Sequence, residues 1–333
     1  MTEPPPSPPD AAQNRRMPVL PRIAHEAMSL LYQHRLVSGP QLLRMLRPDS
    51  PPQYLNRNLL RLHRLGLADR VRAGWGKPNF WFLTETGARA VEGTKDVIDR
   101  PYRMTAFKAS GPLQRHTEAV VETGLAFVEA ARARGDRCGP FDWLPEVSHP
   151  LRDVGERLVA DALLHYISID SRSGRRSHVQ FFIEVDRATM PIPRLAAKLA
   201  AYARYHDYVP GSAAPAHRTS AARSLTPGWR QIYPRFPRVL LVLTGDVPER
   251  LAQRLDDLAF YVRGLPYLHR AREGFAIGAT TLDRLRAHGP VRPIWCPLLH
   301  PTAALTDFLL APLPGGGGGT VSGAATPGAA GGE

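Results

Sequence analysis

Hydrophobic residues recur at helical spacing in three short segments between Pro21 and Val91. Ser38 stands before the second segment and Gln41 follows three residues later, which is the spacing of a capping box. The pattern therefore predicts three helices, within the segments RIAHEAMSLLYQHRL, GPQLLRML and PPQYLNRNLLRLHRLGL.

The third of these helices has two different faces. Its apolar side chains are expected to point inward, and they are Tyr54, Leu55, Leu59, Leu62 and Leu65. The polar side carries amide and guanidinium groups, which read base edges and phosphates in DNA. These candidate DNA-binding residues are Gln53, Asn56, Arg57, Arg61 and Arg64.

Two strand-like runs, LADRVRA and NFWFLT, flank the turn GWGKP and predict a hairpin. Three helices followed by a two-stranded wing is the order of a winged helix-turn-helix, whose third helix fits the DNA major groove. Lys77 in the turn joins the candidate DNA contacts. The alternative is a winged-helix module for protein contacts, with solvated arginines.

The pattern changes beyond residue 112 and predicts a second, larger domain. A helix at 113–135 precedes a short proline-containing strand, FDWLPEVS, which the proline places near a sheet edge. Two long strands, RLVADALLHYISI and HVQFFIEV, surround the polar turn DSRSGRRS. The helix PIPRLAAKLAAYARYH and the apolar strand RVLLVLTGD complete an αβββαβ order, followed by a helix, a strand, a short helix and a last strand, VRPIWCPL.

The remaining segments carry no periodic pattern. Residues 1–20 are rich in proline and residues 311–333 in glycine and alanine, so both are expected to be disordered tails. Residues 92–112 are expected to be a linker between domains at 21–91 and 113–310, and 211–237 an insertion loop. The chain is predicted to be a mixed α/β (α+β) protein.

Charge points to an anionic partner. The 333 residues include 43 Lys+Arg and 30 Asp+Glu, a net charge of +13, and residues 15–110 hold 17 of the basic and 7 of the acidic residues. Such a surplus favours nucleic acid. Of the basic residues only Lys77, Lys95, Lys108 and Lys198 are lysines.

The same composition disfavours several other classes of protein. No apolar run approaches the ~18 residues of a membrane helix, and the N-terminus has no signal-peptide pattern, so a cytoplasmic protein is expected. Cys138 and Cys296 lack the spacing of a disulfide framework or a zinc site. No phosphate-binding glycine motif is present.

Carboxylates lie early in the first and late in the second of the two long strands of the second domain. If the turn DSRSGRRS centres a hairpin, Asp161 opposes Glu184 and Val159 opposes Asp186. Directly opposed side chains have Cβ atoms ~4.5–5.5 Å apart, so two acids held there need a cation or a proton between them. A slip of one residue would move Asp161 to the other face. Lys198, on the next helix, is a candidate to return towards the acids.

Two acids and a lysine suit metal-assisted cleavage of a phosphodiester. Mg²⁺ takes carboxylate, water and phosphate oxygens, and a lysine can stabilise charge on the phosphate. The candidate catalytic residues are Asp161, Glu184, Asp186 and Lys198, with Asp161 and Glu184 as ligands of Mg²⁺ or Mn²⁺. Glu146, Glu122 and His116 are further candidates to complete the site.

The αβββαβ order, with Asp161 early in one strand and Glu184 late in the next, resembles the PD-(D/E)XK nuclease fold. A winged helix followed by VADA, FFIEVDRAT and a Lys-x3-Tyr-x2-Tyr helix resembles the replication-relaxation family of plasmid and mobile-element proteins. The similarity spans residues 20–300. It implies a DNA-binding protein of plasmid replication or transfer that nicks or relaxes DNA.

The sequence departs from the nuclease pattern at two positions. Ala160 replaces the proline of the motif, and Asp186 stands where its lysine is expected. A third acid cannot supply positive charge, so Lys198 or Arg187 would have to replace that lysine. The alternative is a degenerate nuclease fold in which Glu184 and Asp186 form an ion network with Arg187, Arg194 and Lys198.

Two functions remain open. The first is a Mg²⁺-dependent endonuclease or nickase that the winged helix delivers to double-stranded DNA. The second is a non-catalytic replication or transcription factor, whose nuclease-like domain serves dimerisation or DNA clamping; a homodimer stays an open alternative. Covalent nicking by Tyr202, Tyr205 or Tyr208 is disfavoured, because no HxH motif is present and helix tyrosines at this spacing are usually core.

Overall fold

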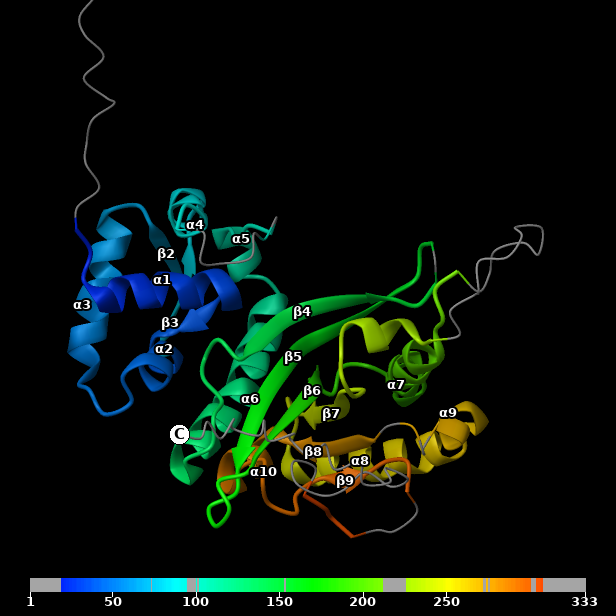
Figure 1. Cartoon of the computed structure of the whole chain (residues 1–333). Coiled ribbons are helices and arrows are strands. Elements are labelled where there is room, and N and C mark those ends of the chain that lie inside the picture. Colours follow the sequence, from blue (N-terminus) through cyan, green and yellow to red (C-terminus); the bar gives the residue numbers. More distant parts are fainter. Residues whose placement is uncertain are drawn as a thin grey trace, which may run out of the picture. The chain divides into compact units, whose positions relative to one another are not determined.

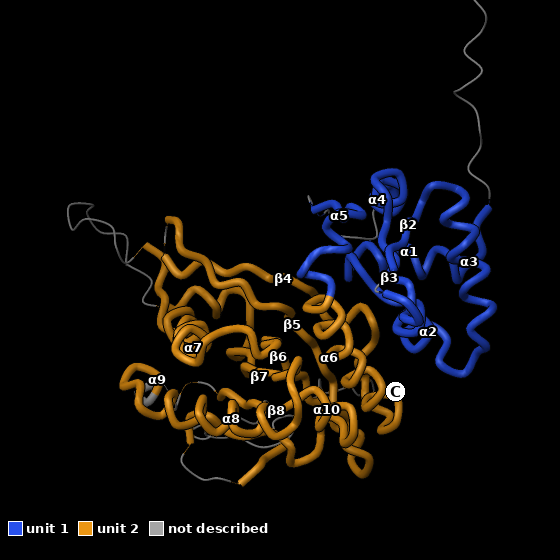
Figure 2. Tube along the Cα trace, turned by 180° about the vertical axis from the view of Figure 1, so that it is seen from behind, with its two compact units in different colours: residues 1–114 blue, residues 115–333 orange. Residues whose placement is uncertain are grey.

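The computed structural model describes residues 19–72, 74–94, 100, 102–152, 154–211, 226–271, 274, 276–300 and 304–307. The chain divides into two compact units, residues 1–114 and 115–333 (Figure 2). Nearly all of the two expected tails, and residues 212–225 of the expected insertion loop, lie outside the described residues. In the part of the chain described, no helix is long and apolar enough to cross a membrane.

Unit 1 contains the three predicted helices and the predicted hairpin, in the predicted order. Its elements are α1 (Arg22–His34), β1 (Val37–Ser38), α2 (Gly39–Leu46), α3 (Pro52–Arg64), β2 (Ala68–Arg72), β3 (Asn79–Leu83), α4 (Glu85–Glu92) and α5 (Ala106–Ala109). The strands form an antiparallel sheet of order β1-β3-β2. The capping box that begins α2 is present, because Ser38 Oγ accepts from Gln41 N and Gln41 Oε1 accepts from Ser38 N.

The inward face of α3 is narrower than predicted. Leu55, Leu59 and Leu62 are buried as expected. Tyr54 and Leu65, also expected to point inward, are 47% and 38% exposed. The buried face includes Asn58 instead, whose side-chain amide donates to Tyr54 O at 2.8 Å. A local hydrogen bond therefore lets a polar residue occupy the inner face.

Described residues of the segment expected to be a linker, 92–112, pack into the core of unit 1. Met104 and Ala109 are buried in a cluster with Leu36, Phe80 and Phe82. Arg103 also makes ion pairs with Glu92 at 2.7 Å and with Glu85 at 3.0 Å. The sequence lacks periodicity here because this segment packs through single side chains rather than along a helical face.

Unit 2 is built around one mixed sheet. Its elements are α6 (Leu113–Arg134), β4 (Trp143–Pro150), β5 (Arg157–Ile169), β6 (Arg176–Asp186), α7 (Ile192–Asp207), η1 (Gly228–Gln231), β7 (Arg238–Leu243), α8 (Pro248–Arg263), α9 (Pro266–Ala271), β8 (Ile277–Thr281), α10 (Leu282–His288) and β9 (Cys296–Pro297). The strand order is β4-β5-β6-β7-β8-β9, with β6, β7 and β8 parallel (Figure 1). The αβββαβ order is confirmed, and β4 lies at a sheet edge as its proline predicted.

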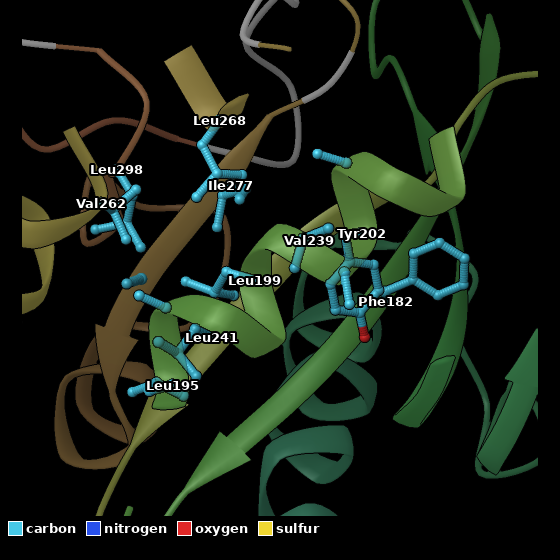
Figure 3. Close-up of a cluster of buried hydrophobic side chains, with 14 of the residues drawn as sticks. Phe182, Leu195, Leu199, Tyr202, Val239, Leu241, Val262, Leu268, Ile277 and Leu298 are labelled. Carbon is cyan, nitrogen blue, oxygen red and sulfur yellow. The ribbon is translucent and has the colours of Figure 1, made fainter. Parts of the chain in front are cut away.

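Helices cover both faces of this sheet (Figure 1). Consecutive residues of a strand point to opposite faces, so the side chains of Phe181 and Phe182 pack into the layers on opposite sides of the sheet. The Phe181 ring lies 5.7 Å from that of Phe127 on α6. Phe182 belongs to the cluster formed with α7, α8 and β7, and its ring lies 5.3 Å from that of Tyr202. Figure 3 shows Leu195, Leu199 and Tyr202 of α7 in this cluster.

Part of the expected insertion loop also packs into that core. Trp229, Tyr233 and Phe236 are buried in the same cluster, and Trp229 Nε1 donates to His206 O at 3.0 Å. Residues 226–237 therefore hold apolar anchors that the non-periodic pattern did not reveal.

Candidate functional site

The predicted register of β5 and β6 is correct, and it ends at the candidate site. Ala162 pairs with Ile183 and Leu163 with Phe182, as an Asp161–Glu184 opposition requires. The ladder stops at Ala162, and Val185 N instead donates to Asp161 Oδ2 at 2.8 Å. The Asp161 side chain therefore takes over as acceptor where backbone pairing ends.

Glu184 lies two residues beyond Phe182 on the same strand face, and it is 1% exposed. The Tyr202 hydroxyl donates to Glu184 Oε1, and Lys198 Nζ makes an ion pair with Oε2. Lys198 and Tyr202 are one turn apart on α7, so both reach the same side of the sheet. One helix thus supplies a partner to each oxygen of this buried acid.

Lys198 connects the two acids. Its Nζ lies 3.4 Å from Asp161 Oδ1 while it contacts Glu184. His116, at the start of α6, places Nε2 3.5 Å from the same Asp161 oxygen. The structure therefore brings together four of the residues singled out in the sequence: Asp161, Glu184, Lys198 and His116.

The single lysine cannot balance both carboxylates. Burial raises the pKa of Asp161, but His116, Lys198 and the Val185 N–H outweigh it and hold that pKa at about 2. Burial and the charge of Asp161 raise the pKa of Glu184 to about 8 against the opposing effects of Lys198 and Tyr202. Burial lowers the pKa of Lys198, but the two acids raise it overall. These shifts favour the charged forms of Asp161 and Lys198 at neutral pH and favour the protonated form of Glu184.

Asp161 and Glu184 are the residues that could hold a metal ion. Asp161 Oδ1 and Glu184 Oε2 converge on one cation, the ammonium of Lys198. Among the described residues no group of three or more His, Cys, Asp or Glu could hold a metal. Two carboxylates nevertheless fit Mg²⁺, which usually completes its shell with water and phosphate oxygens. Binding would displace the proton of Glu184.

Asp186 lies outside this group. It is buried and pairs with Arg254 of α8, at 2.8 Å to Nε and 2.6 Å to Nη2. Arg254 Nη2 also donates to Met190 O. The alternative ion network named Arg187, Arg194 and Lys198 as partners of Glu184 and Asp186. Lys198 does pair with Glu184, whereas the partner of Asp186 is Arg254. Arg254 stands between Leu251 and Leu255 in the apolar stripe of α8, and a basic residue in that stripe was the available signal.

The other two candidate acids take different positions. Glu122 on α6 lies 3.7 Å from Arg286 of α10. Glu146 is exposed on β4, between the pairs Pro145–Ala162 and Val147–Ala160, with φ of 55°. The structure therefore does not place either acid among the contacts of Lys198 described above.

Tyr202 and Tyr205 are core residues of α7, as their spacing predicted, whereas Tyr208 follows the end of the helix and is half-buried. Tyr202 is fully buried and Tyr205 is 1% exposed. Burial, with the charge of Glu184, raises the pKa of Tyr202 well above its ordinary value. Tyr202 is therefore a hydrogen-bond donor to Glu184, a role that sequence reasoning missed because it weighed this residue only as a nucleophile or as core packing.

The predicted DNA-binding residues lie on the surface of unit 1. Gln53, Asn56, Arg57 and Arg64 are exposed on α3, and Lys77 is exposed in the β2–β3 turn. Arg61 is half-buried, and its Nη2 donates to Val19 O at 3.1 Å. The helix therefore presents a polar face of guanidinium and amide groups to solvent.

Together the two units define a mixed α/β protein that has a basic helical module and a buried cluster of two acids and one lysine. The chain belongs to the replication-relaxation family, which matches residues 28–216 and so more than half of its length. The family resemblance drawn from VADA, FFIEVDRAT and the α7 motif is confirmed, over residues 28–216 of the expected span 20–300.

Solved structures give weaker likenesses. A doubly substituted mutant of ZitR from Lactococcus lactis is 15% identical, with 23% of this chain and 51% of that chain covered and a TM-score of 0.20. A singly substituted mutant of the same protein is 14% identical, with 26% and 57% covered and a TM-score of 0.21. The chain thus spans little more than half the length of these proteins. No curated protein matches the chain.

Proposed function

We propose that the chain is a DNA-binding protein of plasmid or mobile-element replication or transfer, and that unit 2 nicks DNA with a divalent metal ion. The observation that carries the proposal is the cluster of Asp161, Glu184 and Lys198, supplied by β5, β6 and α7. Two acids on adjacent strands and a lysine from the following helix are the groups that phosphodiester hydrolysis needs. This arrangement supports a PD-(D/E)XK nuclease-like domain.

Unit 1 supports binding to double-stranded DNA. Its helices and its β2–β3 hairpin follow the winged helix-turn-helix order, in which the third helix enters the major groove. The exposed face of α3 carries Gln53, Asn56, Arg57 and Arg64, side chains that contact base edges and phosphates. The basic surplus of residues 15–110 adds attraction to the DNA backbone.

Each residue of the cluster has a distinct proposed role. Asp161 and Glu184 would hold Mg²⁺ or Mn²⁺, and the bound ion would activate water and stabilise charge on the phosphate. Lys198 places a positive charge beside both acids, where it would neutralise charge that develops on a phosphate oxygen. Tyr202 and the Val185 N–H each fix one oxygen of an acid, so that the other oxygen faces the lysine.

Supercoiled plasmid that carries a cognate origin tests the catalytic proposal. Purified protein is incubated with it in Mg²⁺, Mn²⁺ or EDTA, alongside Glu184→Ala and the exposed-acid control Glu249→Ala. We expect nicking with metal by the wild type and by Glu249→Ala, and none by Glu184→Ala. If Glu184→Ala still nicks the plasmid, the assignment of this catalytic site is wrong. If the wild type nicks it with none of the metal ions, the proposed nicking activity is wrong.

A gel-shift assay with duplex DNA tests the binding proposal. Arg57→Ala and Arg61→Ala are expected to weaken binding, whereas Arg89→Ala on α4, exposed and paired with Glu85, serves as the matched control. Affinity should fall steeply with salt through counterion release. Unchanged shifts for both α3 variants would contradict the assignment of α3 as the recognition helix.

A non-catalytic DNA-binding replication or transcription factor is the second candidate. Asp186 stands where the nuclease fold usually keeps a lysine, and it pairs with Arg254. Burial and the charge of Asp161 also raise the pKa of Glu184, which disfavours the carboxylate that a metal ion would need. Both features suit a degenerate nuclease fold. Salt-dependent binding without nicking in any metal would select this candidate.

A further inference from the structure

Trp75 stands at the tip of the β2–β3 hairpin and is 99% exposed. The four other tryptophans, Trp81, Trp143, Trp229 and Trp295, are at most 6% exposed. An indole is among the largest apolar side chains, and its burial usually stabilises a protein. The Trp75 side chain therefore contributes nothing to the packing of unit 1, and its exposure indicates that it contacts a binding partner.

The turn holds this side chain away from the sheet. Gly74 and Gly76 flank Trp75 with φ of 141° and 71°, which side chains with a Cβ rarely adopt. Lys77 N donates to Gly74 O at 3.3 Å and closes the turn. A tight turn built on two glycines presents the indole at its apex.

Basic side chains surround the turn. Arg70 and Arg72 are exposed and lie two apart on β2, hence on one face of the hairpin, and Lys77 is exposed beyond the tip. The nearby acid, Asp69, lies 3.4 Å from His63 of α3. A flat aromatic ring amid cations fits a ligand that offers both a stacking face and phosphates, which is the chemistry of a nucleic acid.

We propose that Trp75 inserts as a wedge against a base step of the duplex bound by unit 1, while Arg70, Arg72 and Lys77 contact its phosphates. This inference rests on the proposed DNA binding by unit 1. Apolar side chains inserted between base steps unstack and kink duplexes in other DNA-binding proteins, and an aromatic ring can stack on an exposed base whatever its sequence. Trp75 would then determine how the bound DNA is bent, whereas α3 would determine which DNA sequence is bound.

Tryptophan fluorescence tests the proposal in the full-length protein. Because the other tryptophans are buried, emission that acrylamide quenches comes from Trp75, and Trp75→Phe supplies the background. We expect a mixed-sequence duplex at low salt to quench this emission and to protect it from acrylamide. Trp75→Ala should weaken duplex binding about tenfold or more with unchanged thermal unfolding, and Trp75→Phe should weaken it less.

Three outcomes would overturn the wedge. Emission of Trp75 that saturating duplex leaves unchanged, or wild-type affinity of Trp75→Ala, rejects it while the proposed function stands, provided that Arg57→Ala still weakens binding. Quenching by a single-stranded oligonucleotide and not by the duplex also rejects it. If the wild type binds no DNA, the wedge and the proposed function fail together.

Discussion

Lys198 Nζ contacts Glu184 Oε2 and lies 3.4 Å from Asp161 Oδ1, so one ammonium serves two carboxylates. The acids are not equivalent, because Glu184 is buried deeper and its pKa is raised to about 8, whereas that of Asp161 is lowered to about 2. The cluster as a whole is therefore close to neutral at physiological pH. A divalent ion would restore the charge of Glu184 and compete with its proton.

Replacing Lys198 by methionine should destabilise the protein more at high pH than at low pH. At about pH 6 the variant loses only the partner of Asp161, whereas at about pH 9 the charge of Glu184 is also left buried without a partner, a situation that costs about 3–5 kcal/mol. Urea denaturation at both pH values measures the difference. The exposed lysine variant Lys77→Met is the matched control and should show no such dependence on pH.

Glu184 should make the stability of the wild type fall as pH rises between about 4.5 and about 8. Its ordinary pKa of 4.5 is raised to about 8 in the folded state. Between these two values the folded chain therefore binds more protons than the unfolded chain. The contribution of one group to the slope is at most about 1.4 kcal/mol per pH unit. Glu184→Gln should flatten the profile and exceed the wild type in free energy of unfolding near pH 8; an unchanged slope would contradict the raised pKa.

Asp161 should affect the pH dependence of stability in the opposite direction to Glu184. Its pKa is lowered from 3.8 to about 2, so its contribution to stability is complete above the ordinary value and is lost as pH falls towards 2. Asp161→Asn should therefore be less stable than the wild type at neutral pH, and the difference should shrink below about pH 4. A deficit that stays constant down to about pH 2 would show that the carboxylate charge is not its cause.

Tyr202 and Tyr205 form a matched pair, since both are buried on α7 and each loses one hydroxyl on substitution by phenylalanine. Tyr202 donates to Glu184, whereas the Tyr205 hydroxyl has no hydrogen-bond partner among the described residues. Tyr202→Phe should lower the free energy of unfolding by about 1–3 kcal/mol and impair nicking. Tyr205→Phe should change neither. Equal effects of the two variants would rule out a specific role for the Tyr202 bond.

Local patterns in the sequence predicted much of the fold. The polar turn DSRSGRRS fixed the register of β5 and β6, because an antiparallel hairpin is set by its turn. Pairing then placed Asp161 and Glu184 together, and helical spacing placed Lys198 and Tyr202 on one side of α7. Residue types and spacing thus sufficed wherever contacts are local or run along one ladder.

Contacts between distant segments were not predictable in the same way. The partner of Asp186, Arg254, lies on a helix that follows β7, and only the packing of α8 against the sheet brings them together. The burial of Met104 and Trp229 likewise depends on tertiary neighbours and leaves no periodic trace. Tyr54 and Leu65 fit the helical spacing of the apolar residues of α3, yet they are exposed because the rest of unit 1 does not cover their side of the helix.

Asp186 is expected to stabilise unit 2 and to take no part in the proposed nicking. Its side chain is 5% exposed and accounts for two contacts of Arg254, itself 15% exposed, so removing either partner leaves a buried charge. Asp186→Ala and Arg254→Ala should each lower the free energy of unfolding by about 3–5 kcal/mol, and the double variant by less than the sum. Denaturant titrations of the four proteins measure this coupling, and nicking normalised to the folded fraction measures activity. If Asp186→Asn abolished nicking yet unfolded like the wild type, Asp186 would belong with Asp161 and Glu184 in the reaction.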